Sequence, residues 1–495
     1  MSGHTRTSGA VKVNPSKKTP KVGIIYPGSY AEGMSNLAFQ ELFSLCALNK
    51  SVSPVRFFSH ESNEYNENSE NNYSDNSRPE KNHLHDSRGR RNGCISAPFL
   101  FSPEGADVSS ICGAVITSSF ETDILNLLKI ALCLKKYNIP SLLGGLTAVQ
   151  HADTLRSFFT RIYTGVINNE ISAFFNHLPD IPFSDACSSL SSSEFVTPPS
   201  ADKNKPLICH TALLSDSTVF KNTFLIETSR GCRRRCNFCI LSKKSGGYYE
   251  HPSSEILSII SKLPSEVKKI GLVSAAFTDR SDCIALIESI NAIGKEVTVA
   301  SLRMEQLTER LISLLKANNQ RTLTLAPETA DLKIRTNIGK AYSPEHLLRC
   351  AYLAGSAGFH RLKLYYMLGL PEEDDKTAEE ITVQIRQCRD ALNRGAQRSG
   401  IMPKLQISIS PFVPKKGTVL EHAVFAEEHD IKRRVKIIKS RASSLGGVSV
   451  DTESYRFARL QYVVSHKIEE LLPLALRIVE ENGSIRELEK ISRKI

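Results

Sequence analysis

Apolar and polar residues along the first third of the chain form a pattern that predicts strands separated by helices. Lys21–Tyr26 (KVGIIY) has the continuous apolar run of a buried strand, and turn residues follow it at 27–29. Further elements are predicted as a helix at 36–48, strands at 111–119, 139–145 and 161–165, and a helix at 124–136. Strands that alternate with helices form a parallel sheet with helices on both faces. We therefore expect an N-terminal α/β domain.

A second series of strands and helices begins near Thr223. The predicted strands lie at 223–228, 269–274, 296–301, 321–326, 361–367 and 404–410, with amphipathic helices between them. Six such units predict a partial, open version of the β/α barrel, whose active site lies at the carboxyl ends of the strands. The chain from about Glu428 onward is predicted to be mostly helical.

The segments outside these two series differ in composition. Residues 1–20 are basic and polar, and 59–92 are rich in Asn, Ser and charge, so both are predicted to be disordered. The expected division is a tail (1–20), an α/β domain (21–180), a linker (181–221), a β/α core (222–420) and a helical C-terminal region (421–495).

Length and charge narrow the class of protein. The 495 residues contain no run of about 18 apolar residues, so a membrane span is not expected. The N-terminus lacks the apolar core of a secretory signal, so we expect a cytoplasmic protein. The formal charge of +11 permits an anionic partner such as nucleic acid, although a basic tail and solvated helix faces explain it more simply.

Three of the twelve cysteines lie close together in the sequence SRGCRRRCNFC, directly after the predicted strand at 223–228. Cys232, Cys236 and Cys239 thus occupy one short loop, and soft thiolates suit an iron–sulfur cluster or zinc. Structural zinc usually needs a fourth ligand and a second pair of ligands, and the sequence has no second C-x-x-C motif. We predict that these three residues are metal ligands with a catalytic role, with a zinc site or unligated thiols as the alternative.

The C-x-x-x-C-x-x-C loop, with Phe238 before its third cysteine, resembles the defining motif of the radical S-adenosylmethionine (SAM) superfamily. The resemblance implies a [4Fe–4S] cluster with one open iron that chelates SAM. It also implies reductive cleavage of SAM to a radical that abstracts hydrogen from a substrate. A reducing partner such as flavodoxin or ferredoxin would then be needed.

Later segments extend the resemblance. TLAPETA (324–330) is similar to a fourth-strand motif in which Glu328 lies near SAM, and RLKLYYMLGLPEED (361–374) to a fifth-strand segment. In that segment Lys363 would pair with the SAM carboxylate, and Leu370 and Pro371 would line the adenine. The alternatives are a carboxylate at a helix entry for Glu328 and a solvated lysine for Lys363.

Two further positions follow from the same resemblance. The second strand of related proteins often ends in a Gly-Gly-Glu triplet that meets the SAM amino group, and here Ser274 and Ala275 stand in that place. Arg303 matches a recurrent Ser-Leu-Arg, or else forms a structural ion pair. The cofactor-binding residues that the resemblance implies are Phe238, Ser274, Ala275, Arg303, Glu328, Lys363, Leu370 and Pro371.

The N-terminal segments resemble the cobalamin-binding-like domains that precede some radical SAM cores, which implies a flavodoxin-like sheet. The Asp-x-His-x-x-Gly signature of histidine-ligated cobalamin is absent, and no histidine follows the first strand before His60. We weigh a domain without corrinoid slightly above one that binds cobalamin without a protein ligand.

The resulting functional prediction is a radical SAM enzyme that acts on an unknown substrate. One alternative is a cobalamin-dependent methyltransferase or a tRNA-modifying enzyme. A second alternative is a non-enzymatic iron–sulfur protein that has kept the barrel.

Overall fold

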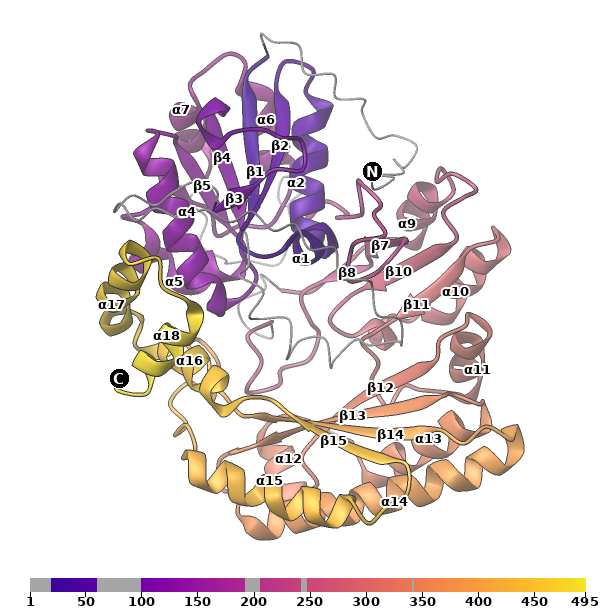
Figure 1. Cartoon of the computed structure of the whole chain (residues 1–495). Coiled ribbons are helices and arrows are strands. Elements are labelled where there is room, and N and C mark those ends of the chain that lie inside the picture. The colour runs from indigo at the N-terminus through magenta and orange to yellow at the C-terminus, as the bar shows by residue number, and fades with distance from the viewer. Residues whose placement is uncertain (1–18, 60–98, 192–204, 242–246, 341) are drawn as a thin grey trace, which may run out of the picture.

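The computed structural model describes the chain except residues 1–18, 60–98, 192–204, 242–246 and 341. The predicted disordered tail and the insertion at 59–92 lie almost wholly outside the described residues. Figure 1 shows an N-terminal α/β unit, a β/α core made of two sheets, and C-terminal helices that return to the N-terminal unit.

The N-terminal unit is built on a sheet with the order β3-β2-β1-β4-β5-β6. All neighbouring strands are parallel except β2 and β3. Apart from the antiparallel edge strand β3, this is the 2-1-3-4-5 order of flavodoxin-like sheets. The strands are β1 (Lys21–Tyr26), β2 (Ser53–Ser59), β3 (Leu100–Phe101), β4 (Gly113–Thr117), β5 (Ser141–Gly144) and β6 (Arg161–Ile162). The predicted parallel α/β fold is confirmed here.

Helices cover both faces of this sheet because its strands are apolar on both sides. One face packs against α2, α6 and α7 and the other against α4. The helices are α1 (Tyr30–Ser35), α2 (Leu37–Leu48), α4 (Ile124–Lys136), α5 (Leu146–Leu155), α6 (Asn169–His177) and α7 (Phe183–Ser189), with short 3-10 turns at Val108–Ser110 and Glu121–Asp123.

The prediction of a linker at 181–221 is wrong for its first part. Helix α7 begins at Phe183, and Phe183, Ala186 and Cys187 are buried in the N-terminal core. The Ser-rich composition of this segment hid the helix, because only three of its side chains face the core.

The β/α core consists of two parallel sheets with the orders β11-β10-β7 and β12-β13-β14-β15. The strands are β7 (Thr223–Glu227), β10 (Lys269–Val273), β11 (Glu296–Val299), β12 (Thr322–Glu328), β13 (Arg361–Leu368), β14 (Lys404–Pro411) and β15 (Val448–Thr452). All six predicted strands are present. A short antiparallel pair, β8 (Ser229–Arg230) and β9 (Tyr249–Glu250), follows β7.

Helices pack on one face of these sheets and form a continuous apolar core with them. They are α9 (Ser253–Ile260), α10 (Cys283–Ala292), α11 (Glu309–Ala317), α13 (Pro344–Ser356), α14 (Asp375–Ser399) and α15 (Glu428–Ala442), with a 3-10 turn at Phe277–Asp279. The shorter α12 (Leu332–Asn337) lies outside this core and contributes Ile334 to a small separate apolar cluster. On β13 the alternating residues Leu362, Leu364, Tyr366 and Leu368 belong to this core. Lys363, between them, therefore faces the opposite side of the sheet.

The region 421–495 is mostly helical, as the sequence predicts, but it also contains one strand. Strand β15 pairs with β14 and extends the core sheet past residue 420. Helices α16 (Tyr455–His466), α17 (Ile468–Glu480) and α18 (Ile485–Ser492) then pack their apolar faces on α4 of the N-terminal unit. These apolar positions predict the helices, but nothing local in the sequence indicates that they complete a core begun 330 residues earlier. Among the described residues, no helix is long and apolar enough to cross a membrane.

Asp123 makes the N-terminal unit sensitive to pH. Its carboxyl group accepts hydrogen bonds from the Ser118 hydroxyl (2.9 Å) and the Phe120 N–H (3.3 Å), and burial raises its pKa to about 7. The native state therefore holds a proton that the unfolded chain releases near pH 4. The stability that this proton confers is complete below pH 4 and is lost as the pH rises through 7, by up to about 3 kcal/mol between pH 5 and 8.

We predict that Asp123→Asn flattens the fall of the thermal unfolding midpoint between pH 5 and pH 8. The amide keeps an oxygen for the Ser118 hydroxyl but does not titrate. Asp153→Asn, at a solvent-exposed carboxylate, is the matched control and should keep the wild-type pH dependence. Parallel pH profiles for Asp123→Asn and the wild type would contradict this role of Asp123.

Candidate functional site

The three clustered cysteines lie on the loop that leaves the carboxyl end of β7, by way of β8. Cys236 is buried, and Cys232 and Cys239 are half-buried. The Cys239 N–H donates to the Cys236 carbonyl oxygen (3.1 Å), which folds the second half of the loop into a turn. The predicted proximity of the three residues is therefore present at the carboxyl end of the first core strand.

Charged and titratable groups surround the Cys236 thiol. Burial raises the pKa of Cys236, the cations of Lys340 and Arg303 lower it, and Cys239 and Cys232 raise it. No group of three His, Cys, Asp or Glu residues in the described chain is arranged around a single metal ion. A cubane cluster differs from a single ion because each thiolate binds a different iron atom.

The segment after α12 holds the cysteine loop from the other side. The Asn237 N–H donates to the Ile338 carbonyl oxygen (3.0 Å), and the Asn237 side-chain amide donates to the Asn337 carbonyl oxygen (2.7 Å). Gly339, with φ of +73°, lies so close that a Cβ there would come within 3.0 Å of the Arg235 carbonyl oxygen. A glycine is needed at this contact for both reasons. The sequence analysis did not select this segment. The available signal was Gly339 just before Lys340, because a glycine at the end of a helix can mark a close backbone approach.

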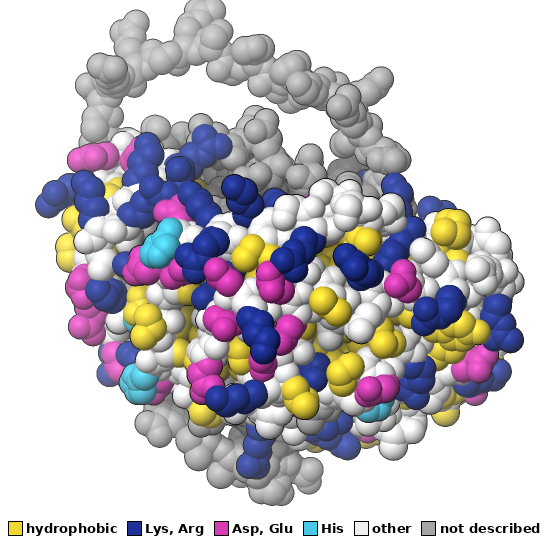
Figure 2. Space-filling model, turned by 90° about the horizontal axis from the view of Figure 1, so that it is seen from below, with side chains coloured by type: hydrophobic (Ala, Val, Ile, Leu, Met, Phe, Trp, Pro, Cys, Tyr) yellow, Lys and Arg dark blue, Asp and Glu magenta, His cyan; other side chains and the backbone are white. Residues whose placement is uncertain are grey.

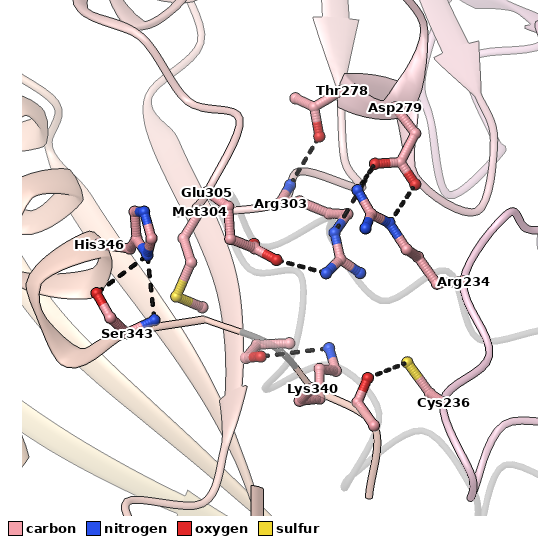
Figure 3. A network of polar contacts seen from close by, with 12 residues as sticks. Arg234, Cys236, Thr278, Asp279, Arg303, Met304, Glu305, Lys340, Ser343 and His346 are labelled. Carbon is pink, nitrogen blue, oxygen red and sulfur yellow. Dashed lines mark hydrogen bonds and ion pairs between the residues drawn. The ribbon is translucent and has the colours of Figure 1, made fainter. Parts of the chain in front are cut away.

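Figure 3 shows a chain of ion pairs beside the loop. Arg234 binds Asp279 through two nitrogens (2.9 and 3.1 Å), Arg303 lies 3.8 Å from the same carboxylate, and Arg303 also pairs with Glu305. The Arg303 N–H further donates to the Thr278 hydroxyl (2.9 Å). Arg303 is therefore held beside Cys236 by partners on two core loops.

The basic run next to the cysteines is mostly paired within the protein. Arg230 binds Glu227 (2.7 Å), and Arg233 binds Glu250 (3.3 Å). Together with the Arg234–Asp279 pair, these contacts fix the loop to neighbouring strands. The charge of this run serves the local structure.

Glu328 ends β12 and lies near the same loop. Its carboxylate pairs with Lys340 (3.1 Å), and burial raises its pKa although Lys340 lowers it. Lys340 also donates to the Ala326 carbonyl oxygen (3.4 Å). The ammonium thus connects the end of β12 with Cys236, whose pKa it lowers. Lys340 is a site residue that sequence reasoning did not select.

Ser274 and Ala275 follow β10, next to the strand that leads to the cysteines. The Thr228 N–H donates to the Val273 carbonyl oxygen (2.8 Å), so the two strand exits are joined directly before Ser274. The Ser274 hydroxyl is buried and has no hydrogen-bond partner among the residues that the structure describes. Such an atom indicates a site for a polar ligand or water.

A small apolar cluster lies beside the cysteine loop. Leu370 is buried in a small cluster with Ile334, Ile338 and Phe412, and Phe238 packs against it. Pro371, predicted beside Leu370, is exposed. The structure therefore brings Phe238 and Leu370 together and leaves Pro371 at the surface.

Lys363 lies lower on the sheet than the other predicted residues. It pairs in register with Thr324, whereas Glu328 pairs with Tyr366 three residues further along β13. At about 3.3 Å per residue the backbone of Lys363 is ~10 Å below the strand ends. Its ammonium lies 4.7 Å from the centre of the Tyr365 ring on the face opposite the helices.

The loops at the carboxyl ends of the N-terminal sheet bind one another. The Asn36 amide donates to the Ser119 hydroxyl (2.9 Å) and the Asn126 amide to the Pro27 carbonyl oxygen (2.8 Å), which joins the exits of β1 and β4. Gly145, after β5, lies so close to the next loop that a Cβ would come within 2.3 Å of the Ser118 carbonyl oxygen. The crevice between β1 and β4, where flavodoxin-like sheets bind ligands, is thus crossed by hydrogen bonds.

An ion pair connects this edge with the core. Lys415, just after β14, binds Glu121, which follows β4, and also donates to the Gln461 side chain (3.0 Å). Glu121 in turn accepts from Gln150 (2.7 Å). The carboxyl ends of the two sheet systems therefore meet at Glu121 and Lys415.

Two curated proteins are similar to part of this chain. Uncharacterized protein MJ0966 of Methanocaldococcus jannaschii is 28% identical over 265 residues, which cover 52% of this chain and 55% of that protein. Uncharacterized methyltransferase PH0819 of Pyrococcus horikoshii is 27% identical over 167 residues, which cover 33% of this chain and 36% of that protein. The chain thus spans about half the length of the first relative and about a third of the second.

Two solved structures also align with this chain. Streptococcus suis SuiB bound to S-adenosylmethionine covers 48% of this chain and 51% of its own, at 13% identity and a TM-score of 0.33. Methylornithine synthase (PylB) covers 50% of this chain and 71% of its own, at 14% identity and a TM-score of 0.31. The family model described as Radical SAM superfamily matches residues 226–384. Those residues include the cysteine loop and the strands β10 to β13, so the chain contains a radical SAM superfamily domain.

Proposed function

We propose that this chain is a radical SAM enzyme in which Cys232, Cys236 and Cys239 ligate a [4Fe–4S] cluster. The observation that carries the proposal is the loop with three cysteines at the carboxyl end of β7, inside the matched residues 226–384. Its surroundings fit a cluster held by thiolates. Burial raises the pKa of the Cys236 thiol, and the cations of Lys340 and Arg303 oppose that rise, so they stabilise the thiolate that a cluster would bind.

The residues around the loop also fit SAM, which combines charged, polar and aromatic parts. The unpartnered Ser274 hydroxyl and the Glu328 carboxylate would hold polar groups of the cofactor at the ends of β10 and β12. Phe238 and Leu370 would cover an apolar part such as the adenine. When bound, the cluster and SAM together supply the one-electron chemistry that starts radical reactions.

Arg303 lies beside the cysteine loop and Lys363 lies lower along β13, so we propose different roles for them. Arg303, bound to Asp279 and Glu305, would orient the loop and hold positive charge near the cluster. Lys363 would need its full side-chain length to approach SAM from below. We therefore propose that its ammonium faces the interior where substrate is held, in place of the pairing with the SAM carboxylate that the resemblance implies.

We propose that the N-terminal unit binds no corrinoid and instead docks on the core, over the proposed site. Its flavodoxin-like strand order is that of the cobalamin-binding-like domains predicted from the sequence. However, hydrogen bonds within the protein cross its crevice, and Glu121 at the same edge binds Lys415 of the core. The unit would then cap the carboxyl ends of the core strands and keep water from the reacting groups.

A cobalamin-dependent methyltransferase is the second candidate, because one relative carries the name methyltransferase and the strand order permits a corrinoid. A tRNA-modifying enzyme has less support. Figure 2 shows Lys and Arg interspersed with Asp and Glu on the face seen from below. On α14 and α15, which lie on the lower side of the molecule in Figure 1, Arg433 pairs with Asp375 (2.8 Å) and Arg441 with Glu379 (2.6 Å).

A non-enzymatic iron–sulfur protein would not need a buried Glu328 or the unpartnered Ser274 hydroxyl near the cysteines. We also propose a cytoplasmic location, and reduction by a flavodoxin or ferredoxin because the resemblance to radical SAM proteins implies such a partner.

Replacing a cluster cysteine should abolish both iron binding and SAM cleavage. After anaerobic reconstitution we expect about four irons per wild-type chain. Cys236→Ala should bind fewer irons and cleave SAM only at background rates, because the buried thiolate is lost. Cys283→Ala, at a half-buried cysteine on α10, is the matched control and should behave like the wild type. Equal iron content and SAM cleavage in Cys236→Ala and wild type would refute the proposal.

The N-terminal unit should not retain a corrinoid. Reconstituted protein incubated with hydroxocobalamin and then desalted is expected to show no corrinoid absorbance. With a substrate present, 5′-deoxyadenosine should accumulate in place of S-adenosylhomocysteine. Retention of one corrinoid per chain, or accumulation of S-adenosylhomocysteine, would instead favour the methyltransferase.

A further inference from the structure

Glu328 occupies a strained backbone turn. Its φ is +67°, a region that costs energy for any residue with a side chain. The Thr329 N–H donates to the Pro327 carbonyl oxygen (2.8 Å), so Glu328 is the central residue of a three-residue γ-turn. The γ-turn with positive φ is the rare and strained form. Such a turn persists only where surrounding contacts over-determine it.

Tyr342 supplies those contacts. Its hydroxyl lies 3.0 Å from the Pro327 carbonyl oxygen and 3.1 Å from the Thr329 carbonyl oxygen. These two carbonyl groups flank Glu328 on either side. A single buried hydroxyl thus shares its proton between the carbonyl groups before and after Glu328 and restrains both ends of the strained turn.

Arg335 packs against the ring of Tyr342 and holds it in place. Its guanidinium lies 4.2 Å from the centre of the Tyr342 ring, and the residue as a whole is 1% exposed. Its three nitrogens have no hydrogen-bond partner within the described part of the chain. A buried cation without an acceptor is costly, so the contact with the ring compensates part of that cost. Because moving the ring would forfeit this contact, Arg335 restricts where the Tyr342 hydroxyl can point.

The turn redirects Glu328. The register of β12 against β13 shifts between Leu325 and Glu328, and irregularities of this kind re-aim a side chain at the end of a strand. The redirected carboxylate lies 3.1 Å from the Lys340 ammonium, on the side of the cysteine loop. Lys340 belongs to the same segment between α12 and α13 as Tyr342, so one short stretch provides both the hydroxyl and the cation.

We propose that Tyr342, seated on Arg335, is a positioning residue that holds the strained turn and aims the Glu328 carboxylate at SAM. The inference rests on the proposed function of Glu328, which the sequence resemblance alone suggested. Tyr342 itself touches no cofactor in this account. It acts through the two carbonyl groups on either side of Glu328.

The test is a cycle of Tyr342→Phe, Glu328→Gln and the double variant, with the dissociation constant of SAM measured on anaerobically reconstituted protein. Tyr342→Phe keeps the ring on Arg335 and removes only the hydroxyl. It should weaken SAM binding about 10-fold, because the turn relaxes and the Glu328 carboxylate is no longer held in the orientation that contacts SAM. In the Glu328→Gln background the same change should add almost nothing, since coupled residues are not additive.

Tyr455→Phe is the matched control, because the Tyr455 hydroxyl also donates to a backbone carbonyl group, that of Ala426 (2.8 Å), far from the site. It should leave SAM affinity unchanged. Tyr342→Phe should melt no lower than Tyr455→Phe, because relief of strain at Glu328 offsets the lost hydrogen bond.

The outcomes distinguish the role of Tyr342 from the role of Glu328. If Glu328→Gln weakens SAM binding but Tyr342→Phe does not, the inference is overturned and the proposed function stands. Additive losses in the double variant would also overturn it, because Tyr342 would then act independently of Glu328. If Glu328→Gln leaves SAM affinity unchanged, the proposed role of Glu328 fails, and this inference fails with it.

Discussion

The site depends on the backbone contact between the cysteine loop and the segment after α12. Asn237 binds Ile338 and Asn337 with its N–H and its side-chain amide, and Gly339 allows the two backbones to touch. This contact joins residues about 100 positions apart, one on the β7 side of the core and the other on the β12 side. Without it the thiols would lie on a loop free to move away from Lys340 and Glu328. The geometry of the proposed cluster site is therefore a product of tertiary packing.

Charge balance around the loop follows from the same arrangement. Asp279 is shared by Arg234 and Arg303, and Glu328 is paired with Lys340. Burial alone disfavours both a thiolate and a carboxylate, because a charged group loses its water. Two cations held in place by buried or half-buried partners oppose that effect at Cys236. Lys340 and Arg303 are thus positive charges placed close to the thiols that would bind the cluster.

Local pattern was enough to predict most of the strands and the position of the cysteine loop. The runs around Lys21, Thr223 and Arg361 are apolar and bounded by turn residues, so each strand is visible in isolation. Strand β15 was missed because VSVDT is short and half-exposed, and its partner β14 lies 40 residues earlier. Helix α7 was missed because its serines mask a few buried side chains. The packing of α16–α18 on α4 depends on contacts that no local window contains.

The candidate site was predictable to a similar extent. The cysteines, Phe238, Leu370 and Glu328 follow from motif and strand position, and the structure brings them near one edge of the core. Pro371 is exposed although it directly follows Leu370, and Lys363 lies lower along β13, because a motif does not determine exposure or height along a strand. Lys340, Tyr342 and Arg335 could not be selected, since their importance comes from a turn at Glu328 that only the folded backbone reveals.

The most direct test of the central claim is electron paramagnetic resonance of the reduced, reconstituted protein with and without SAM. A cluster held by Cys232, Cys236 and Cys239 alone leaves one iron open to SAM. The account therefore predicts that SAM changes the spectrum of the reduced cluster in the wild type. A reduced cluster whose spectrum is identical with and without saturating SAM would contradict it.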